Sequence, residues 1–152
     1  MPSNPPTPLL SVVLPCYNEA RNLGDRYAAV KEDVDLELIM VDNGSKDDTP
    51  AVMAALVADH PFIRCVRVVQ NQGYGDGIRQ GLLAARGTWL AWSHADLQTD
   101  PADVIRAFRI LHAQSAPERV LQRNLDQSAG DHTGVRLKKP RSLSAAVELD
   151  SS

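Results

Sequence analysis

Aromatic residues are few in this sequence of 152 residues, and all of them lie before position 113. Residues 113–152 also lack isoleucine, and they are rich in Ser, Gln, Arg and Lys. A segment with so little apolar surface to bury is not expected to hold a fixed structure. The sequence therefore predicts a flexible N-terminus (1–8), one folded domain (9–112) and a low-order tail (113–152).

Long apolar runs and strong charge are absent as well. No stretch of roughly 18 apolar residues occurs, so we expect no transmembrane segment. The N-terminal residues MPSNPPTP have neither the basic nor the apolar part of a secretory signal. A formal net charge of -3 gives no electrostatic reason to expect a nucleic-acid partner. We expect a cytoplasmic protein.

Cysteine is scarce, with Cys16 and Cys65 on the predicted first and third strands. If another strand lies between them, their spacing is about 9–10 Å. That distance is too long for a disulfide bond, so we expect two buried free thiols.

Apolar runs predict strands over 9–14, 36–41, 63–69 and 89–93, with Pro15 ending the first. Helices are predicted over 22–31, 49–60, 75–86 and from 101 onward, with Thr49 as an N-cap and Gly87 as a C-terminal stop. Strands that are apolar on both sides and alternate with helices predict an α/β fold. Its mostly parallel sheet has helices on both faces.

Ligands of such sheets bind beyond the carboxyl ends of the strands. Polar clusters follow all four predicted strands, and we expect them to line one crevice: residues 17–19, 42–45, 71–73 and 94–98. The turn after the first strand lacks the G-x-G-x-x-G pattern of dinucleotide-binding enzymes, and no Walker-type phosphate loop is present. These absences argue against a nicotinamide-dependent oxidoreductase and a P-loop nucleotide hydrolase.

Four segments within these clusters carry a resemblance to family 2 glycosyltransferases: PCYNE (15–19), VDNGSKDDT (41–49), NQGYG (71–75) and ADLQ (95–98). They follow one another in the order of the family and cover roughly residues 9–112. The sequence is most similar to the branch of dolichyl-phosphate mannose synthases and related polyprenyl-phosphate sugar transferases. The resemblance implies a Rossmann-like nucleotide-sugar-binding domain of the GT-A type. The domain is expected to be incomplete, because the family's acceptor-binding half is not recognisable.

The resemblance also implies roles for individual residues. Pro15, Tyr17 and Glu19 would frame the nucleoside, and Asp42 would bind the edge of its base. A local explanation stays open for each cluster: 17–19 would be a simple loop turn, and 42–45 would cap the following helix.

A divalent metal, Mn or Mg, is implied by the resemblance to the family's D-A-D-L-Q segment. Asp96 and Gln98 match two of its three ligand positions, and His94 stands where the family has the first aspartate. An imidazole suits Mn better than Mg, which favours oxygen ligands. The alternative for His94 is an ordinary surface histidine.

The function implied is transfer of a sugar from a nucleotide-diphosphate sugar to an acceptor, a polyprenyl phosphate by resemblance. Such an acceptor would bring the protein to the membrane periphery. No catalytic base is identified, since nothing in the sequence brings Glu118, Asp126 or Asp131 near the crevice. Two alternatives stay open: a catalytically incomplete nucleotide-binding fragment, and an interaction protein that uses an uncovered sheet edge.

Overall fold

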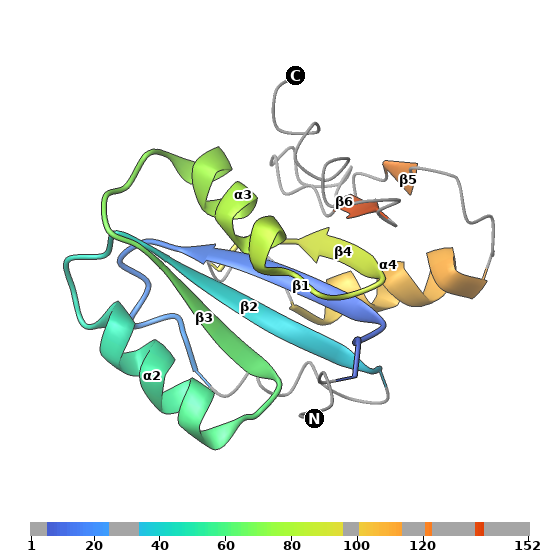
Figure 1. Ribbon diagram of the computed structural model, residues 1–152, viewed down its shortest axis with the longest axis horizontal. Coiled ribbons are helices and arrows are strands. Elements are labelled where there is room, and N and C mark those ends of the chain that lie inside the picture. The colour runs from blue at the N-terminus through green and yellow to red at the C-terminus, as the bar shows by residue number, and fades with distance from the viewer. Residues whose placement is uncertain (1–5, 25–33, 96–100, 114–120, 123–135, 139–152) are drawn as a thin grey trace, which may run out of the picture.

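The sheet is built on four parallel strands in the order β3-β2-β1-β4 (Figure 1). The computed structural model describes residues 6–24, 34–95, 101–113, 121–122 and 136–138. Within them, the parallel strands are β1 (Leu10–Cys16), β2 (Leu36–Asn43), β3 (Ile63–Val68) and β4 (Trp89–Trp92). Two short strands, β6 (Arg136–Lys138) and β5 (Leu121–Gln122), continue the sheet beyond β4 in antiparallel pairing.

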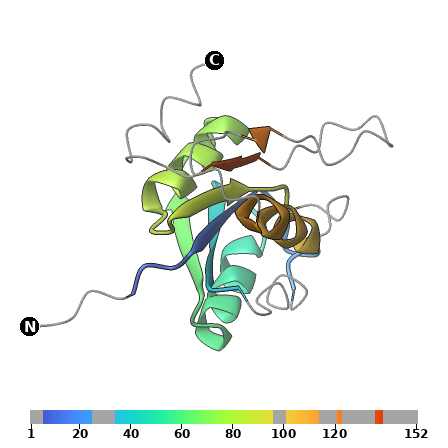
Figure 2. The ribbon, with the colours of Figure 1, turned by 90° about the vertical axis from the view of Figure 1, so that its right-hand side faces the viewer.

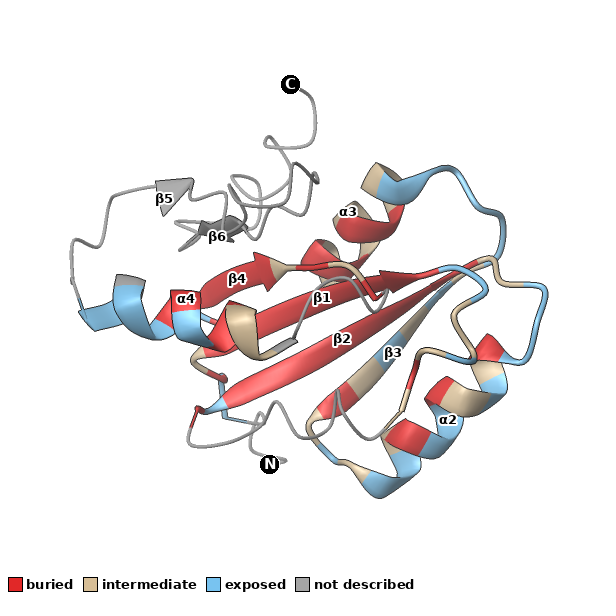
Figure 3. Cartoon of the chain, turned by 180° about the vertical axis from the view of Figure 1, so that it is seen from behind, coloured by how far each residue is buried: buried red, intermediate tan, exposed pale blue. Residues whose placement is uncertain are grey.

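Helices cover both faces of the sheet, as the apolar strand sequences predict. Helices α2 (Thr49–Asp59) and α4 (Pro101–Ala113) lie on one face, and α3 (Tyr74–Ala84) lies on the other (Figure 2). Each face has its own core, and strand residues alternate between them. Met40 packs toward α2 and α4, whereas Val13 and Val41 pack toward α3. The strands β1 and β2 are buried along their whole length (Figure 3).

The approach of α3 to the sheet depends on a glycine. A Cβ atom on Gly81 would lie 2.2 Å from Val13 Cγ1 and 2.9 Å from Val41 Cγ2, closer than real atoms come. The absence of a side chain at Gly81 therefore allows the backbone of α3 to pack closely on β1 and β2.

Strand β1 runs through Pro15, so the prediction that this proline ends the strand is wrong. The Ser93 N–H donates to Val13 O (3.0 Å), so the backbone nitrogen and oxygen of Val13 point toward β4. Those of Pro15, two residues on in the same strand, point to the same side. Because β4 ends opposite Val13, the missing N–H of Pro15 needs no partner there. Strand β2 is also two residues longer than predicted, which makes Asp42 and Asn43 strand residues.

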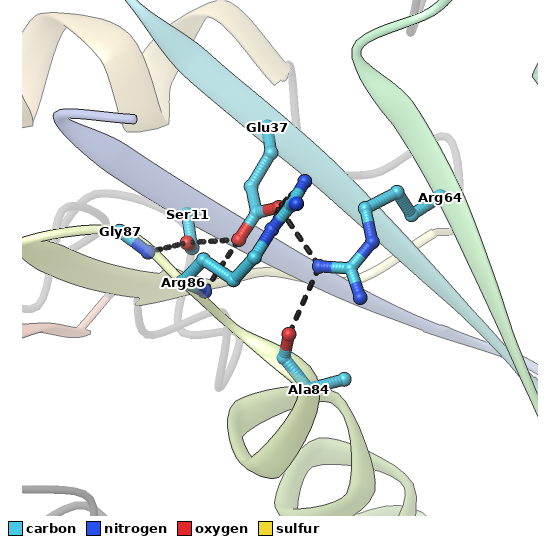
Figure 4. Close-up of polar contacts among 6 residues, drawn as sticks. All are labelled: Ser11, Glu37, Arg64, Ala84, Arg86 and Gly87. Carbon is cyan, nitrogen blue, oxygen red and sulfur yellow. Dashed lines mark hydrogen bonds and ion pairs between the residues drawn. The ribbon is translucent and has the colours of Figure 1, made fainter. Parts of the chain in front are cut away.

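Two helix ends differ from the predictions. Thr49 is the first residue of α2 and not its N-cap, and its N–H donates to Asp47 Oδ1 (2.9 Å). Helix α3 ends at Ala84, and Gly87 is not its stop signal. Instead the Gly87 N–H donates to Ser11 Oγ (2.7 Å), and a Cβ there would lie 2.5 Å from that oxygen (Figure 4).

The predicted pair of buried thiols is half correct. Both cysteines are free and β2 separates their strands, but only Cys16 is buried. Cys65 is exposed, and its strand β3 is an edge strand of the sheet. The predicted helix over 22–31 falls mostly on residues outside the described ranges, and Asn22 lies in a turn.

The C-terminal region of predicted low order contributes the short strands β5 and β6 to the sheet. The other residues of 114–152 lie outside the described ranges, so the low-order tail stays a prediction there. Within the described segments, every helix is too short or too polar to cross a lipid bilayer.

Candidate functional site

A crevice of about 320 Å³ lies at the carboxyl edge of the parallel strands. All four polar clusters that follow the strands contribute to it, as the rule for parallel sheets predicts. Its lining residues are Pro15, Cys16, Tyr17, Glu19, Asn43, Asn71, Tyr74, His94 and Ala95. Pro15, Tyr17, Glu19 and His94 were predicted as site residues from the sequence, and the structure brings these four together.

The loop after β1 is tied to the loop after β2. The Asn18 N–H donates to Ser45 Oγ (3.1 Å), and the Lys46 N–H donates to Asn18 Oδ1 (2.9 Å). One residue on, the Glu19 N–H donates to Thr49 Oγ1 (2.9 Å). We call these two loops, residues 17–20 and 45–49, the loop clamp.

The start of α2 completes the clamp. The Thr49 hydroxyl, which is fully buried, donates to Asp47 Oδ1 while it accepts from Glu19. Asp47 Oδ2 accepts from the Ala20 N–H (3.4 Å). Residues 42–45 thus do not cap α2, whose N-cap is Asp48, and the contacts at the start of α2 come from Asp47 and Thr49. These same two residues also tie down the loop after β1, which forms part of the crevice wall.

The loop after β3 packs on the loop after β2. Gly44 has a φ of 74°, which favours glycine, and a Cβ there would lie 2.8 Å from the Asn71 nitrogen. The Asn43 side chain donates through Nδ2 to Gly73 O (2.9 Å). Asn71 Oδ1 accepts from the Gly73 N–H (2.7 Å) and so bends its own loop. The crevice wall is thus built from three loops in mutual contact.

Asp42, predicted to bind the base, is not among the residues that line the crevice. Successive strand residues point to opposite faces, so Asp42 follows Met40 toward the α2 and α4 side, and Asn43 follows Val41 toward the α3 side. Asp42 is only 3% exposed, and its Oδ1 accepts from the Ser45 N–H (3.0 Å). Its Oδ2 has no hydrogen-bond partner among the described residues and lies 3.9 Å from Arg67 Nε. Asp42 thus forms the turn through one oxygen, and its binding of the base stays a prediction.

Asn43 is one of the crevice residues to which the sequence interpretation gave no role, with Cys16, Asn71, Tyr74 and Ala95. It is 2% exposed, it lines the crevice, and its Oδ1 has no hydrogen-bond partner among the described residues. Its Nδ2 is engaged with Gly73 O, and its Oδ1, which has essentially no solvent-exposed surface, is left without a donor among the described residues. The sequence could have indicated this residue, because side chains alternate along β2. Asn43 lies on the same face as Val41, at the carboxyl end of the strand where the crevice begins.

Also lining the crevice, the His94 imidazole stacks on the Tyr74 ring, with centroids 4.9 Å apart and planes 11° from parallel. This contact joins the end of β4 to the first residue of α3. His94 therefore lines the crevice, and a stack on Tyr74 fits both a metal ligand and an ordinary histidine, so its ligand role stays a prediction. Asp96 and Gln98, the other predicted metal ligands, lie outside the described residues.

The described residues do not by themselves make a metal centre. Nowhere in the described ranges do three His, Cys, Asp or Glu side chains converge as metal ligands would. Of the predicted metal ligands, His94 lies in the crevice wall, which is compatible with a metal but short of a full ligand set.

Cys16 also lines the crevice, but its chemistry excludes a nucleophilic role. Burial raises the pKa of the Cys16 thiol far above its ordinary value, and the nearby Cys65, Glu19 and Asp42 raise it further. The thiol donates to Leu14 O (3.3 Å) and stays protonated at neutral pH.

The model of the family described as glycosyl transferase family 2 matches residues 11–116. The dolichyl-phosphate beta-glucosyltransferase of Dictyostelium discoideum is 32% identical over 115 residues, which are 68% of this chain and 35% of that protein. The chain spans less than half the length of the curated relatives it matches, with 35%, 42% and 33% for three of them.

Solved structures are similar in fold. The mannosyltransferase PcManGT from Pyrobaculum calidifontis, in complex with GDP-Man and Mn2+, has a TM-score of 0.71 at 20% identity, over 91% of this chain and 46% of that chain. Glucosyl-3-phosphoglycerate synthase from Mycobacterium tuberculosis, in complex with Mn2+, UDP and glucosyl-3-phosphoglycerate, has a TM-score of 0.53 at 25% identity. The match covers 68% of this chain and 39% of that chain.

Proposed function

The chain belongs to glycosyltransferase family 2 and has the GT-A fold, and from this premise we propose that its crevice binds a nucleotide-diphosphate sugar as the donor in sugar transfer. The observation that carries the proposal is the free, buried acceptor of Asn43 in a crevice walled by Tyr17 and by the loops of all four family motifs. A buried acceptor without a partner carries an energetic cost, and a ligand N–H or O–H that reached this oxygen would remove that cost.

Each residue of the crevice has a role in this proposal that follows from its side-chain chemistry. The Tyr17 ring, 43% exposed, offers a flat apolar surface on which a nucleobase can stack. Asn43 Oδ1 accepts a hydrogen bond from the nucleoside. Pro15 and Glu19 complete the nucleoside wall, and Asp42 acts behind it by holding the turn at Ser45.

A divalent metal fits this proposal through His94, Asp96 and Gln98. When bound, the metal would neutralise the charge that develops on the leaving nucleoside diphosphate. Glucosyl-3-phosphoglycerate synthase, which is 25% identical to this chain, was solved with Mn2+ and UDP, and this supports a metal here.

The acceptor we propose is a polyprenyl phosphate, in keeping with the dolichyl-phosphate substrate named for the Dictyostelium relative. An oxygen of an ionised phosphate attacks the anomeric carbon, the bond from that carbon to the diphosphate breaks, and the electron pair leaves with the diphosphate. Because this oxygen carries no proton at neutral pH, the step needs no general base. Membrane-peripheral association would follow from such a lipid-linked acceptor.

Binding is the direct test. Thermal unfolding of the purified chain is measured with UDP, GDP, CDP and dTDP, each with and without Mn2+. A nucleotide at about 100 times its Kd should stabilise the fold by about 2.7 kcal/mol, which raises the Tm by roughly 10 °C. Tyr17→Ala should weaken binding about tenfold or more, and Tyr17→Phe, which keeps the ring, should bind nearly as well as the wild type.

The outcomes separate the alternatives. Binding with transfer of sugar to a polyprenyl phosphate supports the full proposal. Binding without transfer supports a catalytically incomplete nucleotide-binding fragment. If none of the four nucleotides binds, the crevice proposal is wrong and the interaction-protein alternative gains.

A further inference from the structure

Asn18 has a backbone conformation that is unusual for a residue with a side chain. Its φ is 52°, and it is the one residue other than glycine with a positive φ in the described part of the chain. The left-handed region costs most L-residues roughly 1–2 kcal/mol, and asparagine tolerates it better than most. Something must hold the backbone there.

Hydrogen bonds of the loop clamp fix the backbone of Asn18 in this conformation. Both the N–H and the Oδ1 of Asn18 bond to the loop after β2, at Ser45 and Lys46 respectively. A bond on each side of the residue fixes its backbone and its side chain together. Asn18 is exposed and does not line the crevice, so these bonds serve no direct contact with a ligand.

The two neighbours of Asn18 do line the crevice. Tyr17 is exposed and Glu19 is half-buried, so core packing holds neither side chain in place, and the Glu19 carboxylate is held only by a hydrogen bond from Asn22 Nδ2 (2.6 Å) among the described residues. Their direction depends on the backbone turn at Asn18. We propose that Asn18 is a positioning residue that keeps Tyr17 and Glu19 aimed into the nucleotide site. This inference rests on the proposed function and deepens it.

A population argument gives the size of the effect. Asn18→Ala removes the acceptor for the Lys46 N–H and keeps a Cβ that opposes the left-handed backbone. The loop then spends most of its time in other conformations. The apparent Kd equals the intrinsic Kd divided by the fraction of molecules whose loop has the binding conformation. If this fraction falls to about one tenth, binding weakens about tenfold.

Three substitutions at one position separate the two parts of this role. Asn18→Ala loses both the backbone preference and the tether, and should bind the nucleotide about tenfold more weakly. Asn18→Gly keeps the backbone preference alone and should lie between alanine and the wild type. Asn18→Asp keeps a carboxylate acceptor for the Lys46 N–H and tolerates the turn, so its Kd should stay within about threefold.

Calorimetric titration measures each Kd with Mn2+ and whichever of UDP, GDP, CDP and dTDP the wild type binds, well below the Tm of every variant. Val57→Ala is the matched control, since Val57 packs on the core from the far half of α2. It lowers stability without touching the loop clamp, so its Kd should equal that of the wild type. Amide exchange at Glu19 gives a ligand-free readout, and it should speed up in Asn18→Ala because its bond to Thr49 loosens.

The results distinguish this inference from the proposed function. If the wild type binds a nucleotide and Asn18→Ala binds it equally well, the positioning role is refuted and the nucleotide site stands. Failure of Asn18→Asp to restore affinity would also refute the role. If the wild type binds none of the nucleotides, both ideas fall together.

Discussion

Glu37 is a carboxylate buried in the sheet, and its removal gives the sharpest stability prediction for this fold. Its side chain is 4% exposed, and both oxygens are occupied (Figure 4). Oε1 accepts from Ser11 Oγ (2.7 Å) and from the Arg86 N–H (2.6 Å). Oε2 accepts from Arg64 Nη1 (2.9 Å) and from Arg86 Nε (3.2 Å). We call these four residues the Glu37 network.

The substitution Glu37→Gln keeps the shape and removes the charge. A glutamine has one acceptor oxygen, so its amide group must face donors of Ser11, Arg64 or Arg86. Losing a buried charged partner typically costs about 3–5 kcal/mol. The two arginine side chains are 35% and 44% exposed and can turn toward water, so we expect a smaller loss of about 2–3 kcal/mol. The control Asp59→Asn removes an exposed charge and should change stability by less than about 0.5 kcal/mol.

The network also predicts a pH dependence. Burial raises the pKa of Glu37, but the hydrogen bonds from the Arg86 N–H, Ser11 and Arg64 and the charge of Arg64 outweigh it, so the pKa lies below its ordinary value. The group therefore stabilises the fold above the ordinary glutamate pKa of about 4.3, and this contribution is lost as pH falls through the lowered value.

Urea unfolding followed by the fluorescence of Trp89 and Trp92 in β4 measures the effect at pH 7, 5 and 3. The gap in unfolding free energy between wild type and Glu37→Gln should be the same at pH 7 and 5, and should shrink at pH 3. A gap that is independent of pH over this range, or no gap at pH 7, would refute the reasoning.

Three further predictions concern the sheet and the crevice. Gly81→Ala brings a methyl group onto Val13, so urea unfolding should report a loss of about 1–3 kcal/mol with Trp fluorescence as the probe. Thr49→Val leaves the Glu19 N–H and Asp47 without their shared partner, and thermal unfolding should show a loss of about 1–2 kcal/mol. Asn43→Ala removes the free acceptor, so calorimetry should show nucleoside-diphosphate binding weakened about tenfold.

The fold could be predicted because its strands are buried on both sides. A strand such as Leu36–Asn43, buried at every position, leaves no solvent face, and only helices on both faces satisfy it. The ends of the elements were less predictable. A proline usually ends a strand because it lacks an N–H. Here the nitrogen of Pro15 points past the end of β4, where no hydrogen bond is needed. That outcome depends on the register between β1 and β4, which is a tertiary property.

The candidate site was predictable to the level of loops and less so to the level of side chains. Each motif follows a predicted parallel strand, and the carboxyl ends of parallel strands lie at one edge of the sheet. This predicts that Tyr17, Glu19 and His94 lie together, as they do in the crevice. The choice between Asp42 and Asn43 required knowing which face of β2 borders the crevice. The Tyr74–His94 stack joins residues from different elements, and no local pattern in the sequence indicates such a contact.

The two ends of the parallel sheet differ in how their polar atoms are satisfied. At the amino ends, the Glu37 network occupies both carboxylate oxygens and joins β1, β2 and β3 to the connection between α3 and β4. At the carboxyl ends, Asn43 Oδ1 and Ser93 Oγ are buried without hydrogen-bond partners within the described residues, and Asp42 Oδ2 has only an ion pair with Arg67 Nε at 3.9 Å. Buried polar groups without partners destabilise a fold, and they persist where a ligand or function uses them. The carboxyl ends therefore combine the hydrogen bonds of the loop clamp with the left-handed turn at Asn18 and the unpaired oxygen of Asn43, whereas the amino ends leave neither oxygen of Glu37 unpaired.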